Sequence, residues 1–503
     1  MRISVSHISE PVLQFGDYFD HQDPKTGLAE YGPFGINVPG LHLQEIRLGF
    51  IGTRESISGT KEWVERCSGY IESENLKVIK EKIRSNENSL FANPINLDDY
   101  EVKRLNKIQN RDFPGFNTET PFKCSFVSNP RWERIINHRE LQEILDIQEK
   151  KDRISKLVEL IDTHLHSITN SDPTPHVVII ALTNEIEEKA DSVQISQNYY
   201  FNLRRAIKAK AMNQDTAIPI QILRRRTVEG KGDVQEPAIR AWNFCTAQYY
   251  KAGGVPWIAP TLEHDTCYVG VSFYVCEDSN DELQMRSSIA QAFDFRGEGV
   301  ILRGDPFKWD MNLGRSPHLT RSGACKLMED TLRDYLNTTG HTASRVVLHK
   351  TSTFWGNDRG EYDEISGLYE GIDSICPRCQ IDFVSMAQTG VRLFREGRYP
   401  PLRGTVFMIE GKEQFLYTMG FVPYLETYPR AHVPQPWQLI QHIGDSSPKD
   451  LFKEILTLTK MNVNNCDFAD GSPITISFSQ KVGEIMKHIE EGARVQSSYR
   501  FYM

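Results

Sequence analysis

The sequence lacks a long hydrophobic run. Its mean hydropathy is −0.45, and its strongest apolar segment, residues 177–182, is far shorter than the roughly 20 residues that a membrane-spanning helix needs. The first residues, Met1 to Ser6, contain no apolar stretch of the kind that a secretory signal carries. We therefore expect neither a membrane protein nor a secreted one, and the composition predicts a cytoplasmic protein.

Cysteine and net positive charge are also scarce. The 503 residues include nine cysteines, an odd number that argues against a disulfide framework and favours a reducing compartment. Lys and Arg number 58 against 67 Asp and Glu, so the net charge is −9. This balance excludes nucleic-acid binding through bulk charge, although it is compatible with a local basic groove.

The first half of the chain alternates between expected strands and helices. Residues 177–182 are apolar without interruption, which is typical of a parallel strand that is buried on both faces. This alternation predicts a Rossmann-like α/β domain. The expected strands cover residues 46–51, 122–127, 177–182 and 218–223, and the expected helices cover 59–71, about 140–166 and 199–212.

The pattern changes after residue 265. Three strands that we expect to be antiparallel are followed by a helix, a strand, a helix and a strand, which is the order of a ribonuclease-H-like sheet. These elements are expected at 268–275, 290–295, 299–303, 323–336, 344–349, 363–372 and 379–386. We therefore expect an extended segment that packs on the body (1–43), a Rossmann-like domain (44–240) and a ribonuclease-H-like domain (241–503).

A basic cluster stands out in this acidic chain. Tyr200, Arg204 and Lys208 have i, i+4, i+8 spacing and would share one helix face. Gln221 lies on the next expected strand, and Lys251 precedes a Gly-Gly turn. Cations together with an amide that donates hydrogen bonds predict a phosphate site. The alternative is a solvated basic helix face.

Three motifs in this order resemble the guide 5′-phosphate pocket of an Argonaute MID domain. They are Arg-x-x-x-Lys (204–208), Ile-Pro-x-Gln (218–221) and Lys-x-Gly-Gly-x-Pro-Trp (251–257). The resemblance implies that Arg204, Lys208, Gln221 and Lys251 grip the terminal phosphate of a guide. Arg204 replaces the tyrosine that is common at the first position, and Tyr200 would then supply base stacking.

The resemblance also implies a divalent cation, Mg²⁺, at the phosphate. Its ligands would be Gln221 and the carboxylate of Met503. The last five residues, Tyr-Arg-Phe-Tyr-Met, are compact and apolar enough to be buried. The alternative for them is an ordinary segment that packs for stability alone.

The resemblance extends over essentially the whole chain. The Gly- and Pro-containing opening (23–35), the Phe-Pro-Gly-Phe motif (113–116) and the order of elements after residue 265 are similar to a short prokaryotic Argonaute with only MID and PIWI domains. The fold implied is a Rossmann-like MID domain followed by a ribonuclease-H-like PIWI domain.

The acidic residues of a nuclease are missing where the resemblance places them. A ribonuclease-H fold cuts nucleic acid with carboxylates that hold two divalent ions. The three expected positions carry Ser272, Lys350 and Gln480, and the loop glutamate of the family has no assigned counterpart, although Glu298 lies near its expected place. We therefore expect a degenerate PIWI domain that does not cleave a target.

The resemblance implies a guide-binding subunit of a two-chain defence system. Its partners would be a guide RNA, a target single-stranded DNA and an APAZ-containing effector with a TIR, Sir2 or nuclease domain, such as one that depletes NAD. One alternative is an active guide-directed endonuclease with displaced acids. Another is a dinucleotide-dependent enzyme built on residues 44–230, against which the single glycine of Gly-Thr-Arg-Glu (52–55) argues.

Overall fold

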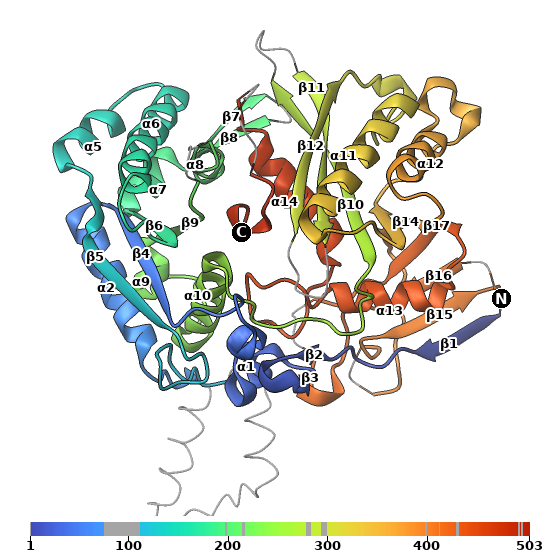
Figure 1. Ribbon diagram of the computed structural model, residues 1–503, viewed down its shortest axis with the longest axis horizontal. Coiled ribbons are helices and arrows are strands. Elements are labelled where there is room, and N and C mark those ends of the chain that lie inside the picture. Colours follow the sequence, from blue (N-terminus) through green and yellow to red (C-terminus); the bar gives the residue numbers. More distant parts are fainter. Residues whose placement is uncertain are drawn as a thin grey trace, which may run out of the picture.

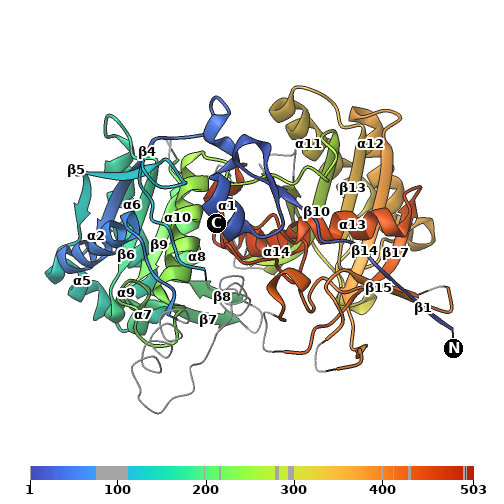
Figure 2. The ribbon, with the colours of Figure 1, turned by 90° about the horizontal axis from the view of Figure 1, so that it is seen from below.

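The structure is a computed structural model. It describes residues 2–503 except 75–110, 197–198, 214–216, 278–282, 293–298, 398–399, 412, 429–431, 491–492 and 494–495. Two lobes lie side by side, each built around a sheet, and residue 503 lies between them in both views (Figures 1 and 2).

The first lobe is a three-layer α/β unit around four parallel strands in the order β5-β4-β6-β9. Every residue of β6 is buried because helices cover both faces of the sheet. The strands are β4 (Glu45–Gly52), β5 (Ser125–Ile135), β6 (Val177–Leu182) and β9 (Ile220–Arg224), and a hairpin of β7 (Ser192–Ser196) and β8 (Tyr199–Asn202) lies apart from them.

Apolar side chains divide the helices of this lobe between the two faces. Leu48 and Phe50 share a core with Trp63 of α2 and Trp242 of α10, whereas Ile180 packs in another core with the helices of the opposite face. The helices are α2 (Arg54–Ser68), α5 (His138–Leu145), α6 (Lys150–Thr169), α7 (Asn184–Ala190), α8 (Leu203–Ala211), α9 (Arg225–Glu229) and α10 (Pro237–Ala252).

The second lobe is built on a nine-stranded sheet in the order β1-β15-β16-β17-β14-β13-β10-β11-β12. Strand β10 pairs in parallel with β13, which pairs in parallel with β14, and the other pairs are antiparallel. The strands are β1 (Ile3–His7), β10 (Thr266–Glu277), β11 (Leu283–Ala292), β12 (Val300–Phe307), β13 (Arg345–Lys350), β14 (Gln380–Gln388), β15 (Thr405–Ile409), β16 (Glu413–Leu416) and β17 (Trp437–Gly444).

Helices cover both faces of the large sheet. Helices α11 (Arg321–Thr339) and α12 (Glu364–Ile375) pack together on one face. Helix α14 (Ile474–Met486) lies against β10 and β11 on the other face, and α13 (Pro448–Leu458) belongs to the same core. The approach of α14 to β10 is so close that a Cβ on Gly270 would lie 1.9 Å from the main-chain oxygen of Thr475.

The N-terminal residues join the second lobe. Strand β1 pairs with β15 at one edge of the nine-stranded sheet. Glu10 lies 2.9 Å from Arg403 Nε and 2.8 Å from Lys460 Nζ, and both cations are almost completely buried. A two-stranded sheet of β2 (Leu13–Gln14) and β3 (Asp20–His21) and the helix α1 (Pro24–Tyr31) follow.

The predicted fold class, a Rossmann-like domain followed by a ribonuclease-H-like domain, is confirmed, with three local differences. The helix expected over 140–166 is two helices, α5 and α6, and the guanidinium of Arg153 binds the main-chain oxygen of Ile147 between them at 2.7 Å. The helix expected from residue 199 begins at Leu203. The boundary placed at 240/241 lies within α10, which packs against β4 and β6, so the chain passes to the second sheet after Ala252.

Within the described part of the chain, every helix is too short or too polar to cross a bilayer. The eight cysteines whose side chains the structure describes are all free thiols.

Candidate nucleic-acid interface

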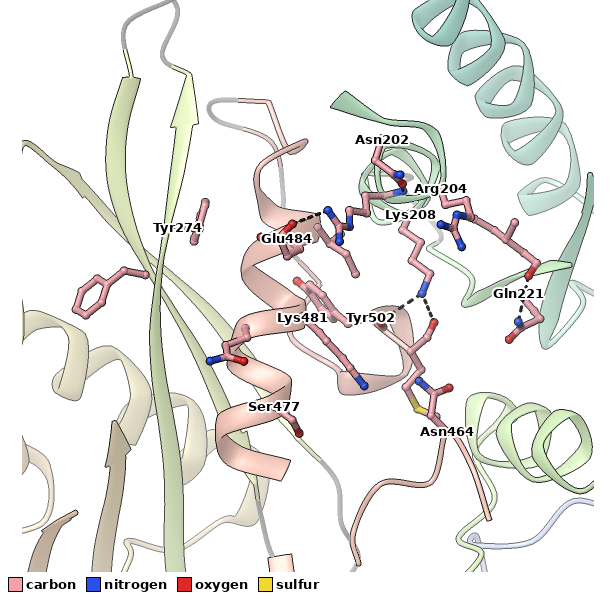
Figure 3. A pocket seen from close by; sticks show the side chains of 16 residues that line it. Asn202, Arg204, Lys208, Gln221, Tyr274, Asn464, Ser477, Lys481, Glu484 and Tyr502 are labelled. Atoms are coloured by element: carbon pink, nitrogen blue, oxygen red, sulfur yellow. Dashed lines mark hydrogen bonds and ion pairs between the residues drawn. The ribbon is translucent and has the colours of Figure 1, made fainter. Parts of the chain in front are cut away.

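A polar pocket of about 840 Å³ lies between the two lobes. One wall comes from α8 and β9 of the first lobe, and the other comes from α14 and the C-terminal residues (Figure 3). The lining residues are Asn202, Arg204, Arg205, Lys208, Gln221, Ile222, Phe273, Tyr274, Asn464, Ser477, Gln480, Lys481, Glu484, Ile485, Tyr502 and Met503. Cationic side chains outnumber the one acidic side chain of the lining, Glu484, so the pocket suits an anion.

Helix α8 presents cations to the pocket because its apolar residues face the other way. Asn202 caps the helix by accepting a hydrogen bond from the main-chain N–H of Arg205 at 3.3 Å. Leu203, Ala206 and Ile207 are buried in the core of the first lobe. The opposite face of the helix then carries the positively charged side chains.

Lys208 contacts the last residues of the chain. Its ammonium donates to the main-chain oxygen of Tyr502 at 3.3 Å and to the main-chain oxygen of Met503. Burial, together with the nearby charges of Arg204 and Lys481, lowers the pKa of Lys208 to about 8. An anion in the pocket would relieve this repulsion between cations.

Gln221 is held by a second lysine from behind the pocket wall. The ammonium of Lys251, at the end of α10, donates to Gln221 Oε1 at 2.6 Å and to the main-chain oxygen of Ile220 at 3.0 Å. Gln248 also donates to Gln221 Oε1, at 3.2 Å. Lys251 is 2% exposed and does not line the pocket, and burial holds its pKa well below the ordinary value. Lys251 therefore orients Gln221 in the present arrangement.

Arg204 lines the pocket but also has an acidic neighbour. Its Nε lies 3.6 Å from Asp191 Oδ1, and Arg224 approaches the same carboxylate at 3.8 Å. Glu187 pairs with Arg224 and Arg226. The fold therefore brings acidic residues to this basic cluster from α7 and from the residue that follows α7.

Tyr200 does not take the predicted position. It lies on β8, opposite Gln194, rather than one turn before Arg204 on a helix. Its side chain is 49% exposed, and it is not among the pocket residues. The reason is local: the side chain of Asn202 caps α8, so the residues before it are extended. Of the predicted set, the structure brings Arg204, Lys208, Gln221 and Met503 together, with Lys251 behind them.

Helix α14 supplies residues that the sequence did not assign to this pocket. Ser477, Lys481 and Glu484 follow one another at i, i+4 and i+7 and line the second wall. Glu484 pairs with Arg205 across the lobes at 2.5 Å and with Lys487 at 2.6 Å. The sequence feature that could have indicated them is their spacing, which places three polar residues on one face of an otherwise apolar helix.

The three expected catalytic positions do not converge. Gln480 lines the pocket between the lobes. Lys350 pairs with Val271 in register on β10 and lies 5.3 Å from the ring of Phe273. Because side chains alternate along a strand, Ser272 faces the opposite side of the sheet from Lys350. Glu298 lies outside the described residues.

Lys350 is neither exposed nor available to a phosphate. Its ammonium pairs with Glu364 at 2.7 Å, and both side chains are 3% exposed. His318 Nδ1 lies 2.9 Å from the same carboxylate. Over the residues that the structure describes, no group of three or more His, Cys, Asp or Glu is arranged to hold a metal ion.

Comparisons with known proteins give a match in fold alone. No family model matches the sequence, and no curated protein matches it. A structure of Clostridium butyricum Argonaute, bound to a guide DNA and a 19-mer target DNA, is 14% identical with a TM-score of 0.58, over 99% of this chain and 55% of that one. Aa-Ago with externally bound siRNA (12%, TM-score 0.56) and Drosophila Piwi (10%, TM-score 0.56) each match 99% of this chain and 56% of their own.

The chain therefore has the fold of the MID and PIWI domains of Argonaute proteins. It spans about half the length of the solved structures that it matches. Solved Argonaute structures with this fold contain guide and target DNA or siRNA.

Proposed function

We propose that this chain is a guide-dependent nucleic-acid recognition subunit. It binds a guide, RNA in our proposal, by a 5′ phosphate placed in the pocket between the lobes, and presents the guide bases to a target single-stranded DNA. The observation that carries the proposal is the convergence of Arg204, Lys208 and Gln221 on one pocket, with Lys251 bonded to Gln221 at 2.6 Å. Base pairing then recognises the sequence, while the protein recognises the phosphate and the backbone.

The pocket has the chemistry for a terminal phosphate. Lys208 now donates to the main-chain oxygens of Tyr502 and Met503, and a phosphate dianion would compete for that ammonium. The side-chain amide of Gln221 is held from behind by Lys251 and Gln248. A phosphate would thus meet both charge and an oriented amide group.

Mg²⁺ fits the same wall in our proposal. Gln221 Oε1 and the main-chain oxygens of Tyr502 and Met503 are oxygen donors of the type that Mg²⁺ prefers, and each already accepts from a lysine ammonium. When bound, Mg²⁺ would neutralise phosphate charge. Lys208 would move from the main-chain oxygens toward the phosphate.

We also propose that the chain does not cleave its target. The support is the ammonium of Lys350, which is buried against Glu364 at an expected metal-binding position, and a metal cation beside it would be repelled. The alternative is an active guide-directed endonuclease with acids elsewhere in the sheet. A labelled target offered with guide and either Mg²⁺ or Mn²⁺ separates the two, because only the alternative gives cut products.

An enzymatic partner completes the proposal. On the resemblance of the sequence to short Argonautes, we propose a cytoplasmic heterodimer with an APAZ-containing effector that carries a TIR, Sir2 or nuclease domain. Pairing of guide with target would activate this effector in antiviral or antiplasmid defence, for example by NAD depletion. Expression with the product of the adjacent gene, followed by sequencing of the bound oligonucleotide, tests the partner and the guide.

The binding experiment compares 5′-phosphorylated and 5′-hydroxyl guides of the same sequence. Replacing Lys208 with Ala removes a charge-assisted contact worth about 2–4 kcal/mol, so affinity for the phosphorylated guide should fall roughly 30- to 1000-fold. Lys251→Ala should have a similar effect because Lys251 orients Gln221. Gln221→Leu removes the side-chain amide directly and leaves the buried Lys251 in place. Lys453→Ala, an exposed lysine on α13, is the control. Equal losses for the two guides would refute the phosphate role.

A further inference from the structure

The N-terminal strand β1 forms an open edge of the large sheet. It is the end strand in the sheet order, and among the strands that the structure describes it pairs only with β15. All five of its residues are exposed, and Ile3 and Val5 are 42% and 64% exposed. Both views place β1 at the outer margin of the second lobe (Figures 1 and 2). The proposed guide site between the lobes therefore does not account for this edge.

The backbone of β1 turns hydrogen-bonding groups to the open edge at alternate residues. The main-chain N–H of Glu410 donates to the oxygen of Arg2 at 2.8 Å, and that of Ile8 donates to the oxygen of Gly404 at 2.9 Å. Both bonds fit the antiparallel register of β1 with β15. Because hydrogen-bonded pairs alternate along such a register, the even-numbered residues bond to β15 and the odd-numbered ones point their N–H and C=O groups away from it. The odd-numbered residues of β1 are Ile3, Val5 and His7.

Strand β1 lacks the features that usually protect a sheet edge from another chain. Its sequence, Ile-Ser-Val-Ser-His (3–7), contains no lysine, acidic residue or proline. The edge strand on the other side of the same sheet, β12, contains Asp305 and Pro306, and the N–H of Ile301 at its start already donates to Ser497. An edge that is exposed, uncharged and partly apolar is the kind to which a further strand adds.

We infer that β1 pairs with β1 of a second copy of this chain, antiparallel and about a two-fold axis at Val5. Val5 then faces Val5 of the second copy, Ile3 faces His7, and Ser4 faces Ser6. This register uses all the outward residues of both copies, and each facing pair of them exchanges two hydrogen bonds. Apolar side chains meet at the axis, hydroxyls meet beside it, and no like charges are opposed. The inference goes beyond the proposed function and does not depend on it.

Apolar side chains beside β1 favour a protein surface as the occupant of this edge. Val5 lies opposite Phe407 in register, so the two side chains are on the same face of the sheet. Phe407 stacks on Phe415 at 4.4 Å, and Leu393 packs on the same cluster. Phe394, the next residue, is 79% exposed. A phosphate backbone requires cations instead. One short strand and this apolar face make less than a standard interface, so we expect a weak dimer with a Kd on the order of 10 μM.

Sedimentation velocity of the full chain, from about 1 to about 100 μM, measures the association. We expect mostly monomer at the low end of this range and mostly dimer at the high end. Val5→Pro removes an outward N–H without removing a hydrogen bond to β15, so the variant should keep its fold and remain a monomer. Val5→Lys should weaken the dimer about 10-fold by placing two cations at the axis. Val433→Lys, at another valine that is 53% exposed, is the matched control and should dimerise like the unmodified chain.

Hydrogen exchange of the main-chain amides provides a second readout. The amides of Ile3, Val5 and His7 should exchange more slowly at the high concentration than at the low one, whereas those of Ser4 and Ser6 should be protected at both, because they bond to β15. Slower exchange at the odd-numbered residues that is absent from Val5→Pro would support the seam.

Three outcomes would overturn the inference. The first is a chain that stays monomeric at about 100 μM, and the second is a dimer that persists in Val5→Pro or is lost in Val433→Lys. The third is a monomer that binds the co-expressed product of the adjacent gene only when Val5 is intact, which would assign the edge to that protein. Affinity of Val5→Pro for a 5′-phosphorylated guide should be unchanged, so that failure of this inference leaves the proposed function intact.

Discussion

The ammonium of Lys350 lies 2.7 Å and 2.8 Å from the two carboxylate oxygens of Glu364. The same carboxylate accepts from the main-chain N–H of Leu319 at 2.8 Å. Burial raises the pKa of Glu364, but the charge of Lys350 and the hydrogen bonds from His318, Lys350 and Leu319 together hold that pKa below its ordinary value. The pair is thus a charged, hydrogen-bonded unit in the interior of the second lobe, between β13 and α12.

Breaking this pair from one side should destabilise the protein. Lys350→Met leaves the carboxylate of Glu364 buried without its cation, and we expect the free energy of unfolding to fall by about 3–5 kcal/mol. Urea denaturation measures the change. The double variant Lys350→Met with Glu364→Gln removes both charges and should recover part of the loss. Unchanged stability of the single variant would contradict a buried ion pair.

Guide binding should weaken as the pH rises through the pKa of Lys208. That pKa is about 8, so the ammonium is charged at pH 7 and mostly neutral at pH 9. The second pKa of a phosphate is about 6, so the ligand itself does not titrate in this window. We expect affinity for the 5′-phosphorylated guide to fall between pH 7 and pH 9. Because bound phosphate favours the ammonium, the pKa of Lys208 is higher in the complex, and the affinity falls from the pKa of the free protein up to that of the complex.

The matched control for this profile is Lys208→Arg. Arginine keeps its charge throughout the same range, so the variant should show a flat profile between pH 7 and pH 9. An equally steep profile in the arginine variant would show that another group titrates. A 5′-hydroxyl guide should show little dependence on pH in either protein.

The acid of the pocket should oppose guide binding. Glu484 pairs with Arg205 at 2.5 Å, which ties up a cation and adds a negative charge to the phosphate site. Glu484→Gln should raise affinity for a phosphorylated guide several-fold. It should also steepen the dependence of affinity on salt, because one more cation is free to contact phosphate. Lower affinity in this variant would indicate that the pair is needed to hold the lobes together.

Removal of divalent ions should weaken binding of phosphorylated guides. If Gln221 Oε1 and the oxygens of the last two residues hold Mg²⁺ as proposed, EDTA should lower the affinity, and added Mg²⁺ should restore it. Gln221→Ala should reduce the effect of EDTA on affinity. Isothermal titration with Mn²⁺, with and without guide, supplies a second measurement. Equal affinity with and without EDTA would exclude the ion.

Local patterns predicted most of the elements, because helix and strand periodicity depends on neighbouring residues. The buried run 177–182 is β6, and the strand expected at 344–349 is β13 within one residue at each end. Tyr200 was misplaced because Tyr200, Arg204 and Lys208 have helical spacing, whereas the helix begins only after Asn202, whose side chain caps it. Periodicity alone does not distinguish these cases.

The sequence predicted the pocket residues of the first lobe but not those of the second lobe. Arg204, Lys208 and Gln221 lie within 18 residues of one another, and their motifs identify them. Lys481 and Glu484 come from a helix more than 250 residues later in the chain, and only the packing of α14 against β10 and β11 brings them to α8. The burial of Lys350 could not be predicted from the sequence either, because Lys350 lies on β13 and its partner Glu364 lies on α12.

Residues 497–499 close an edge of the large sheet. The main-chain N–H of Ile301 donates to Ser497 at 2.7 Å, and the N–H of Tyr499 donates to Gly299 at 2.9 Å. Four residues later the same segment supplies the oxygen that holds Lys208. One short segment, residues 497–503, therefore joins the pocket to the edge strand β12 of the large sheet. An occupant that displaces Tyr502 and Met503 would therefore also disturb the main-chain hydrogen bonds that join this segment to β12 and the residue before it.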